Sequence, residues 1–295
     1  MRKRRKLLIV LGYLAVGVGV IAFLERDQEP TYHGRPLHDW TYVCTANRLG
    51  WGRDWGFGNI GVNEAYDAIK AIGPAAVPHL VKWISYEPNP FQSKIVGFLQ
   101  PLRKGPLIRF IPVPNSPNTA SLRATLALDG FKVLGPDAAS AAPQLLSLAR
   151  RSRTPEGAEQ VIEALASLGP QGVLALAQIV ADPPAKSAAE DAVHLRSTAM
   201  NRLARMGPDA VPAVPVLVAC QSDTDKQFAM QADAAIKSII ATVVSQCTSP
   251  ASYRVDSVTP ALRALLNDPS PRVRVNTTNA ILEVERASLQ SWLRR

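Results

Sequence analysis

One glycine-rich stretch has a spacing that could support cofactor chemistry. GFGNIG, residues 56–61, matches the Gly-x-Gly-x-x-Gly pattern, in which the backbone of a loop approaches a dinucleotide pyrophosphate. A dinucleotide site also needs a buried strand before this loop and an acidic residue about 20 positions after it. The sequence shows neither feature. We interpret the stretch as a turn and expect no cofactor.

The histidines could bind a metal or act in catalysis, but their spacing argues against both. His33, His38, His79 and His194 are scattered, and the sequence contains no His-Glu dipeptide and no Cys-x-x-Cys. Zinc sites commonly use such closely spaced ligands. The Gly-x-Ser-x-Gly and phosphate-binding loop motifs are also absent. We therefore expect no metal site, no catalytic residue and no enzymatic activity.

The three cysteines, Cys44, Cys220 and Cys247, do not form a disulfide framework. We predict a helix of about 20 residues between Cys220 and Cys247, which separates them by about 30 Å. A disulfide requires Cα atoms within about 7 Å of each other. We interpret the cysteines as buried or free thiols.

Aromatic residues and arginine are enriched at binding hot spots, and one segment combines them. Trp51, Arg53 and Trp55 lie within a stretch rich in Gly and Trp. This stretch is a candidate partner or ligand site, or alternatively a hydrophobic cap over the first structural unit. His79, which follows Pro78 near the start of a predicted helix, is a further candidate for partner binding.

The first 24 residues predict a membrane anchor. Residues 7–24, LLIVLGYLAVGVGVIAFL, carry no charge, and as a helix they span about 27 Å, close to the thickness of a bilayer core. Residues 1–6 are basic and ERDQE beyond the apolar run is net acidic, so the N-terminus is expected in the cytoplasm. We predict an uncleaved single-pass anchor in the inner membrane, with the rest extracytoplasmic or periplasmic. A secreted protein released by signal cleavage is the alternative.

The charge outside this tail is modest. The formal net charge is +9, and five of the positive charges lie in residues 2–6, which leaves +4 elsewhere. A nucleic-acid surface needs basic residues concentrated in the folded part. We therefore expect no nucleic-acid partner.

The order hydrophobe–Gly–Pro occurs four times and predicts the ends of four helices. The apolar residues before each glycine recur at the spacing of one helical face, as Ala65, Ile69 and Ile72 do before the first. Glycine can adopt the left-handed conformation that ends a helix, and proline fits the first turn of the next helix. The four pairs are Gly73-Pro74, Gly135-Pro136, Gly169-Pro170 and Gly207-Pro208.

The spacing of these pairs predicts a helical repeat. Successive glycines are 62, 34 and 38 residues apart, and each pair is followed by a second apolar helix. Two helices per 34 to 40 residues is typical of stacked helical repeats, in which each unit buries its apolar face against its neighbours. The long first interval contains a proline-rich insertion at about 85–118. Its basic and apolar residues could dock on lipid headgroups, grip an acidic partner or pack back over the helices.

The helices resemble HEAT repeats over about residues 62–286. The last unit, LRALLNDPSPRVRVNTTNAIL, has the aspartate-loop-Val-Arg arrangement of that family, and HLRSTAMNRLARMGP and SLRATLALDGFKVLGP are similar to it. The resemblance implies that Arg123, Arg196 and Arg274 make structural contacts with loop groups. It also implies an all-α fold, a right-handed α-α superhelix whose second helices line the inner surface.

A second, narrower resemblance is to bacterial membrane-anchored HEAT-repeat proteins. PTYHGRPLHDW, residues 30–40, follows the predicted anchor and is similar to a Tyr-x-Gly-x-x-Leu-x-x-Trp segment of those proteins. The predicted organisation is a basic tail at 1–6, an anchor at 7–24, a linker and Trp-rich cap at 25–60, and repeats at 61–295.

These patterns favour a non-catalytic scaffold that holds a partner protein on the inner face of the repeats. Two other functions stay open: an envelope enzyme or enzyme accessory with a Trp-lined ligand subsite, and a nucleic-acid-binding HEAT protein. The sequence does not indicate an oligomeric state.

Overall fold

The structure, a computed structural model, describes residues 29–50, 60–85, 117–152, 154–182, 189–248 and 255–293. The predicted basic tail, the predicted anchor at 7–24, the Trp-rich segment at 51–59 and nearly all of the predicted insertion lie outside these ranges. Within them the fold is all-α apart from one short hairpin. The all-α class predicted from the sequence is confirmed at this level.

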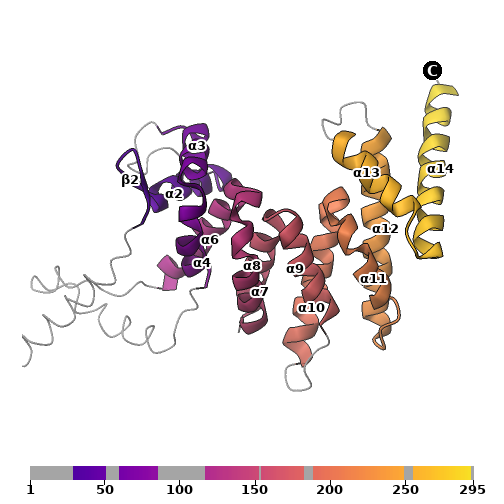
Figure 1. Ribbon diagram of the computed structural model, residues 1–295, viewed down its shortest axis with the longest axis horizontal. Coiled ribbons are helices and arrows are strands. Elements are labelled where there is room, and N and C mark those ends of the chain that lie inside the picture. The colour runs from indigo at the N-terminus through magenta and orange to yellow at the C-terminus, as the bar shows by residue number, and fades with distance from the viewer. Residues whose placement is uncertain are drawn as a thin grey trace, which may run out of the picture.

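The helices form a row that runs from the N-terminal to the C-terminal end of the described chain (Figure 1). After α2 (Leu37–Arg48), the first helix of each successive pair contacts the first helices of the pairs before and after it. These first helices are α3 (Val62–Ile72), α6 (Pro117–Leu134), α8 (Pro155–Ser167), α10 (Ala189–Met206), α12 (Lys226–Thr248) and α14 (Pro271–Leu293).

The second helices pack beside their partners. Helix α7 contacts α9, and α9 contacts α11, so these three second helices form a continuous layer in the middle of the row. The second helices are α4 (Val77–Ile84), α7 (Ala142–Arg151), α9 (Pro170–Ala181), α11 (Val214–Cys220) and α13 (Val255–Leu266).

The four Gly-Pro pairs lie at the turns between first and second helices. Their glycines all have positive φ, between 58° and 67°. The expected left-handed helical conformation is wrong, however, because ψ is −137° at Gly73 and −142° at Gly169 instead of about +47°. Residues with a Cβ atom adopt this combination of positive φ and strongly negative ψ far less readily than the left-handed helical conformation. The requirement for glycine at these turns is therefore stronger than predicted.

Short 3₁₀ turns follow three of these glycines, which the sequence did not indicate. They are η1 (Gly73–Ala76), η3 (Gly135–Ala141) and η4 (Gly207–Ala213), whereas α9 begins directly at Pro170. The second prolines Pro78, Pro143 and Pro215 occupy the first turn of their α-helices, where their missing N–H groups need no partner.

The predicted apolar stripes form the core. Phe131, Leu165 and Leu203 are fully buried, as are most of the residues that share their register before each Gly-Pro pair. Ile72 and Met206 are partly buried and pack against the same core. One continuous cluster of buried side chains therefore links the helix pairs along the row, as mutual stacking requires.

Three local features differ from the sequence interpretation. Strands β1 (Thr31–Tyr32) and β2 (Arg35–Pro36) form an antiparallel hairpin whose turn, His33-Gly34, has positive φ at both residues. The sequence CTSPASYRVDS, residues 247–257, predicts a loop, but helix α13 begins at Val255. The sequence LQSWLRR, residues 289–295, predicts a separate short helix, but α14 is continuous to Leu293.

Two described stretches, Val193–Cys220 and Lys226–Gln246, are long and apolar enough to cross a membrane by length and composition alone. Core helices pass the same test, and 44% of the apolar 18-residue window in each stretch is buried inside the protein. Neither lies near the N-terminus.

Candidate functional site

The candidate binding residues predicted from the sequence do not come together in the described structure. Trp51, Arg53 and Trp55 lie outside the described residues. His79 is in the first turn of α4 and is partly buried, and its Nδ1 atom has no hydrogen-bond partner among the described residues.

The most extended candidate site is a layer of exposed side chains on α7, α9 and α11, here named the second-helix surface. On α9, Gln171, Leu174 and Gln178 are exposed at the spacing of one helical face. Leu174 is 48% exposed, an unusual exposure for a leucine in the middle of a row. The other members of the surface are Pro143, Gln144, Pro215 and Ala219.

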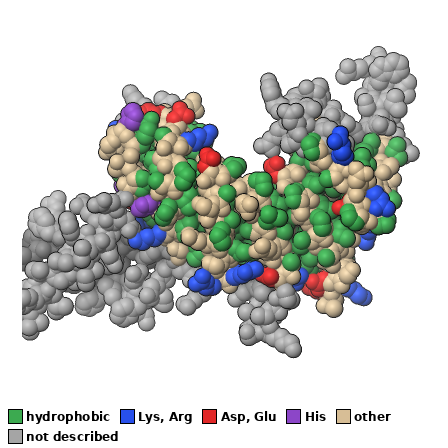
Figure 2. All heavy atoms as spheres, viewed as in Figure 1, with side chains coloured by type: hydrophobic (Ala, Val, Ile, Leu, Met, Phe, Trp, Pro, Cys, Tyr) green, Lys and Arg blue, Asp and Glu red, His purple; other side chains and the backbone are tan. Residues whose placement is uncertain are grey.

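The second-helix surface is distinctive in its lack of charge. Helices α9 and α11 contain no charged residue, and α7 contains no acid. By contrast, the first helix α8 carries Glu156, Glu159 and Glu163. Figure 2 shows the same property on the face that it draws: hydrophobic and uncharged atoms occupy the middle of the row, and charged side chains lie mainly at its edges. Such a surface is desolvated at little electrostatic penalty.

Two arginines lie where α7 ends, beside this surface. Arg150 forms an ion pair with Asp182, and Arg151 donates hydrogen bonds to the backbone oxygen and the hydroxyl of Ser147. No ion pair joins Arg151 to an acid within the described residues. Arg151 therefore places a positive charge at one border of the uncharged surface.

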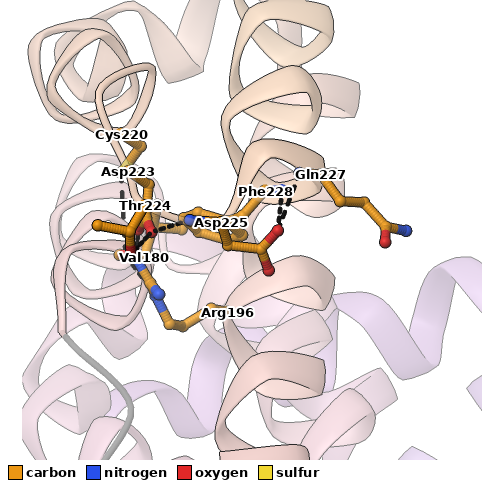
Figure 3. Close-up of polar contacts among 8 residues, drawn as sticks. All are labelled: Val180, Arg196, Cys220, Asp223, Thr224, Asp225, Gln227 and Phe228. Atoms are coloured by element: carbon orange, nitrogen blue, oxygen red, sulfur yellow. Dashed lines mark hydrogen bonds and ion pairs between the residues drawn. The ribbon is translucent and has the colours of Figure 1, made fainter.

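Arg196, on α10, makes contacts with loop groups of the kind that the HEAT resemblance implies (Figure 3). Its Nε donates to the Val180 carbonyl oxygen over 3.0 Å, and its Nη2 lies 3.0 Å from Asp223 Oδ2. The guanidinium also stacks over the Phe228 ring, 3.9 Å from the centroid. Arg196 thus joins the end of α9, the loop after α11 and the start of α12.

The environment of Asp223 supports this role. The Asp225 N–H hydrogen bond, followed by the contact with Arg196, lowers the pKa of the Asp223 carboxyl. In turn, Asp225 accepts hydrogen bonds from the backbone of Gln227 and Phe228, and so caps the first turn of α12. The loop after α11 is therefore held by a chain of carboxylate contacts.

The other two arginines from the resemblance differ from Arg196. Arg274 Nη1 donates to the carbonyl oxygens of Asp268 and Pro269, at 2.6 and 3.0 Å, in the loop between α13 and α14. Arg123 is partly buried on α6, near enough to Glu29 and His38 for its charge to lower the pKa of both groups.

The sequence analysis missed a buried carboxylate between α2 and α6. Asp129 is 4% exposed; it accepts from the Thr45 hydroxyl at 2.6 Å and from Arg48 Nε at 2.8 Å. Burial, followed by the nearby Asp129 charge, raises the pKa of the Cys44 thiol to about 12. This cysteine is therefore protonated and unreactive at neutral pH. The cluster attaches α2 to α6, the first helix of the second pair.

A second missed cluster lies at the start of the described chain. The Glu29 carboxylate accepts from the backbone N–H of His38 at 3.3 Å and lies 2.7 Å from its Nδ1, while His38 Nε2 lies 3.1 Å from Asp39 Oδ1. The hydrogen bond with Glu29 raises the pKa of His38 above its ordinary value, against the opposing effect of burial. Burial raises the pKa of Glu29, but its contacts with His38 outweigh that effect and leave it lowered. Both groups are thus charged over a range of mildly acidic pH.

Neither cluster resembles a metal or catalytic site. No group of three or more His, Cys, Asp or Glu side chains could hold a metal ion within the part of the chain that the structure describes. The ring nitrogens of His38 contact acids on opposite sides, so Glu29 and Asp39 do not converge on one point. The described polar clusters join helices and loops.

Comparisons with known proteins identify no family. No family model matches the chain, and neither does any curated protein. One solved structure that it resembles is described as "Computational Design of Self-Assembling Cyclic Protein Homooligomers". The two are 15% identical with a TM-score of 0.26, over 96% of this chain and 97% of the other. A similarity this low indicates neither a shared fold nor a shared function.

Proposed function

We propose that this protein is a single-pass, membrane-tethered scaffold built from HEAT-like helical repeats, which binds a partner protein along its second-helix surface. The helix pairs form a right-handed superhelical solenoid with the second helices on its inner side. The row of stacked pairs and the positive-φ Gly-Pro turns support this proposal. No catalytic step is part of it.

The observation that carries the binding proposal is the uncharged second-helix surface with Leu174 exposed near its centre. An exposed leucine surrounded by glutamine and proline side chains offers apolar area with hydrogen-bonding groups at its borders. Protein interfaces combine an apolar centre, poor in charged residues, with a polar rim. A partner segment that covers Leu174 would gain most of its binding energy there.

The membrane part of the proposal rests on the sequence of residues 7–24 and their basic flank. An anchor at this position leaves the N-terminus in the cytoplasm and the repeats on the extracytoplasmic side of the inner membrane. The two apolar stretches within the row are assigned to the protein core, because Arg196, Arg202 and Arg205 interrupt the first and Asp233 and Lys237 the second.

Crosslinking in living cells tests the binding surface. Leu174→Asp places a charge at the centre of the surface, and Met230→Asp makes a similar change on α12, where Met230 is 73% exposed. Both variants should keep the thermal stability of the wild type. We expect a partner crosslinked to the wild type to be retained by Met230→Asp and lost by Leu174→Asp. Equal recovery by both variants, or no partner with the wild type, would contradict the proposal.

Proximity labelling tests the topology separately. A labelling enzyme fused after Arg295 should mark extracytoplasmic proteins, and the full-length chain should stay in the membrane after carbonate extraction. Labelling of cytoplasmic proteins would overturn the orientation. A soluble product cleaved after Gly17, at the small-x-small site Ala15-Val16-Gly17, would favour the secreted form.

A further inference from the structure

We propose that Glu29 and His38 form a pH-operated clasp that holds the start of the folded chain on the N-terminus of α2 most firmly in mildly acidic conditions and loosens as the pH rises. The clasp consists of the two contacts from the Glu29 carboxylate to His38, one to the ring and one to the backbone N–H. It goes beyond the scaffold function and lies outside the proposed binding surface.

The geometry makes Glu29 a cap for α2. His38 is the second residue of this helix, which begins after Pro36, and Pro36 offers no side-chain cap of its own. The Glu29 carboxylate accepts the free His38 N–H, where the positive end of the helix dipole also favours a negative charge. The Leu37 N–H is satisfied in the same way by the Pro30 carbonyl oxygen, at 3.0 Å. Residues 29 and 30 together therefore cap the helix.

The imidazole ring adds the pH dependence. Three charged groups face His38: Glu29 from the segment before the hairpin, Asp39 from α2 itself, and Arg123 from α6. The two acids favour the charged ring and Arg123 opposes it. Asp39 is the neighbour of His38 on the same helix, so only the contact with Glu29 joins two segments of chain. Protonation of the ring therefore strengthens the attachment of Glu29 to α2, which the backbone hydrogen bonds have already positioned.

The pH window follows from the directions of the two shifts. The pKa of His38 is raised, so its contribution to the stability of the clasp is complete below the ordinary histidine value of about 6.5. This contribution is lost as the pH rises through the raised value. The contribution of Glu29, whose pKa is lowered, is present above about 4.3 and is lost as the pH falls through the lowered value. The clasp is strongest between these two limits.

The clasp holds the residue at which the described chain begins. On the proposed topology, residues 25–28 connect Glu29 to the membrane anchor, so release would lengthen the connection between the bilayer and the first helix pair. This consequence rests on the proposed function. The clasp itself consists of Glu29 and His38, both within the described chain, so the test below reads it independently of membrane attachment.

Histidine NMR of the full chain in detergent micelles provides the first test. Isotope labelling of the imidazole Cε1 atoms gives four signals, and His38→Gln identifies the one of interest. We expect the His38 signal to titrate above the ordinary histidine value of about 6.5. Glu29→Gln should lower the titration point of His38. An unchanged titration point in Glu29→Gln would overturn the proposal.

Hydrogen–deuterium exchange at the Leu37 and His38 amides measures closure itself. After correction for the intrinsic pH dependence of exchange, wild-type protection should fall about two- to fivefold between pH 5.5 and 8.5, the size expected for a partly exposed ion pair. Asp39→Asn is the matched control: it also removes an acid beside His38, but its amide protection should still fall between pH 5.5 and 8.5. In Glu29→Gln the amide protection should not fall over this range. Constant protection in the wild type, or a wild-type response in Glu29→Gln, would refute the clasp.

Discussion

Replacement of Arg196 is expected to destabilise the row strongly, because three contacts depend on one side chain. Arg196→Ala leaves the buried Val180 carbonyl with only the weak contact from Cys220 Sγ at 4.0 Å, at a cost of about 1–3 kcal/mol. It also removes the stacking on Phe228, about 0.5–2 kcal/mol, and the ion pair with Asp223, whose side chain is 21% exposed. The loss of a partner from a buried pair is typically 3–5 kcal/mol, so we expect about 3 kcal/mol in total.

Thermal unfolding of the full chain measures this effect. For a folded part of this size, 1 kcal/mol corresponds to about 2–4 °C, so Tm should fall by about 6–12 °C. Arg196→Lys keeps the charge but cannot contact Val180 and Asp223 together, so its Tm should fall by about half as much. The control is Lys237→Ala, which removes the surface ion pair with Asp233, about 0.3–0.5 kcal/mol. A Tm for Arg196→Ala within 2 °C of this control would refute the reasoning.

The pH dependence provides an independent check of the same contact. The pKa of Asp223 is lowered in the folded state, so its contribution is present above the ordinary aspartate value of about 3.9 and is lost as the pH falls through the lowered value. The difference in Tm between wild type and Arg196→Ala should therefore shrink below about pH 4. A difference that stays constant down to pH 2.5 would show that the Asp223 charge is not involved.

Two further predictions concern the buried cluster and the turns. Asp129→Asn should lower the unfolding free energy by about 2–3 kcal/mol and Thr45→Val by about 1 kcal/mol, both measured by urea unfolding; equal effects would contradict the assigned ion pair. Gly73→Ala should lower the unfolding free energy by about 1–2 kcal/mol through backbone strain alone, since a Cβ at this position meets no atom within 4 Å. Gly207→Ala should lower the unfolding free energy further, because its Cβ would lie 2.7 Å from Thr242 Cγ2. Adding Thr242→Ser should restore part of this loss of stability. A double variant with no restored stability would show that the steric contact is unimportant.

The helix pairs were predictable because their signal is local. The residues at minus eight, minus four and minus one from Gly135 place Ala127, Phe131 and Leu134 on one face, and all three are buried. The sign of φ at Gly135 followed from the same pattern. The ψ angles and the 3₁₀ turns did not, because they depend on how neighbouring pairs pack and not on the residue type.

The Asp129 cluster was not predictable because its members are distant in sequence. Asp129 contacts residues more than 80 positions earlier, on a helix from which the proline-rich insertion separates it. A single aspartate before Gly130 reads as an ordinary exposed helical residue. The one usable signal was Tyr-His-Gly-Arg at 32–35, since an x-Gly pair between extended residues indicates a tight hairpin turn.

The arrangement of contacts has a mechanical consequence. Among the described residues the main contacts between helices join neighbours in the row: α6 contacts α8, α8 contacts α10, and α14 contacts α12 and α13. The boundaries between pairs therefore lie in series, and each carries the full force applied between the two ends of the chain. Under tension the pairs would detach in sequence and give a series of small extension steps, so the molecule would yield gradually and re-form piece by piece when the load is removed.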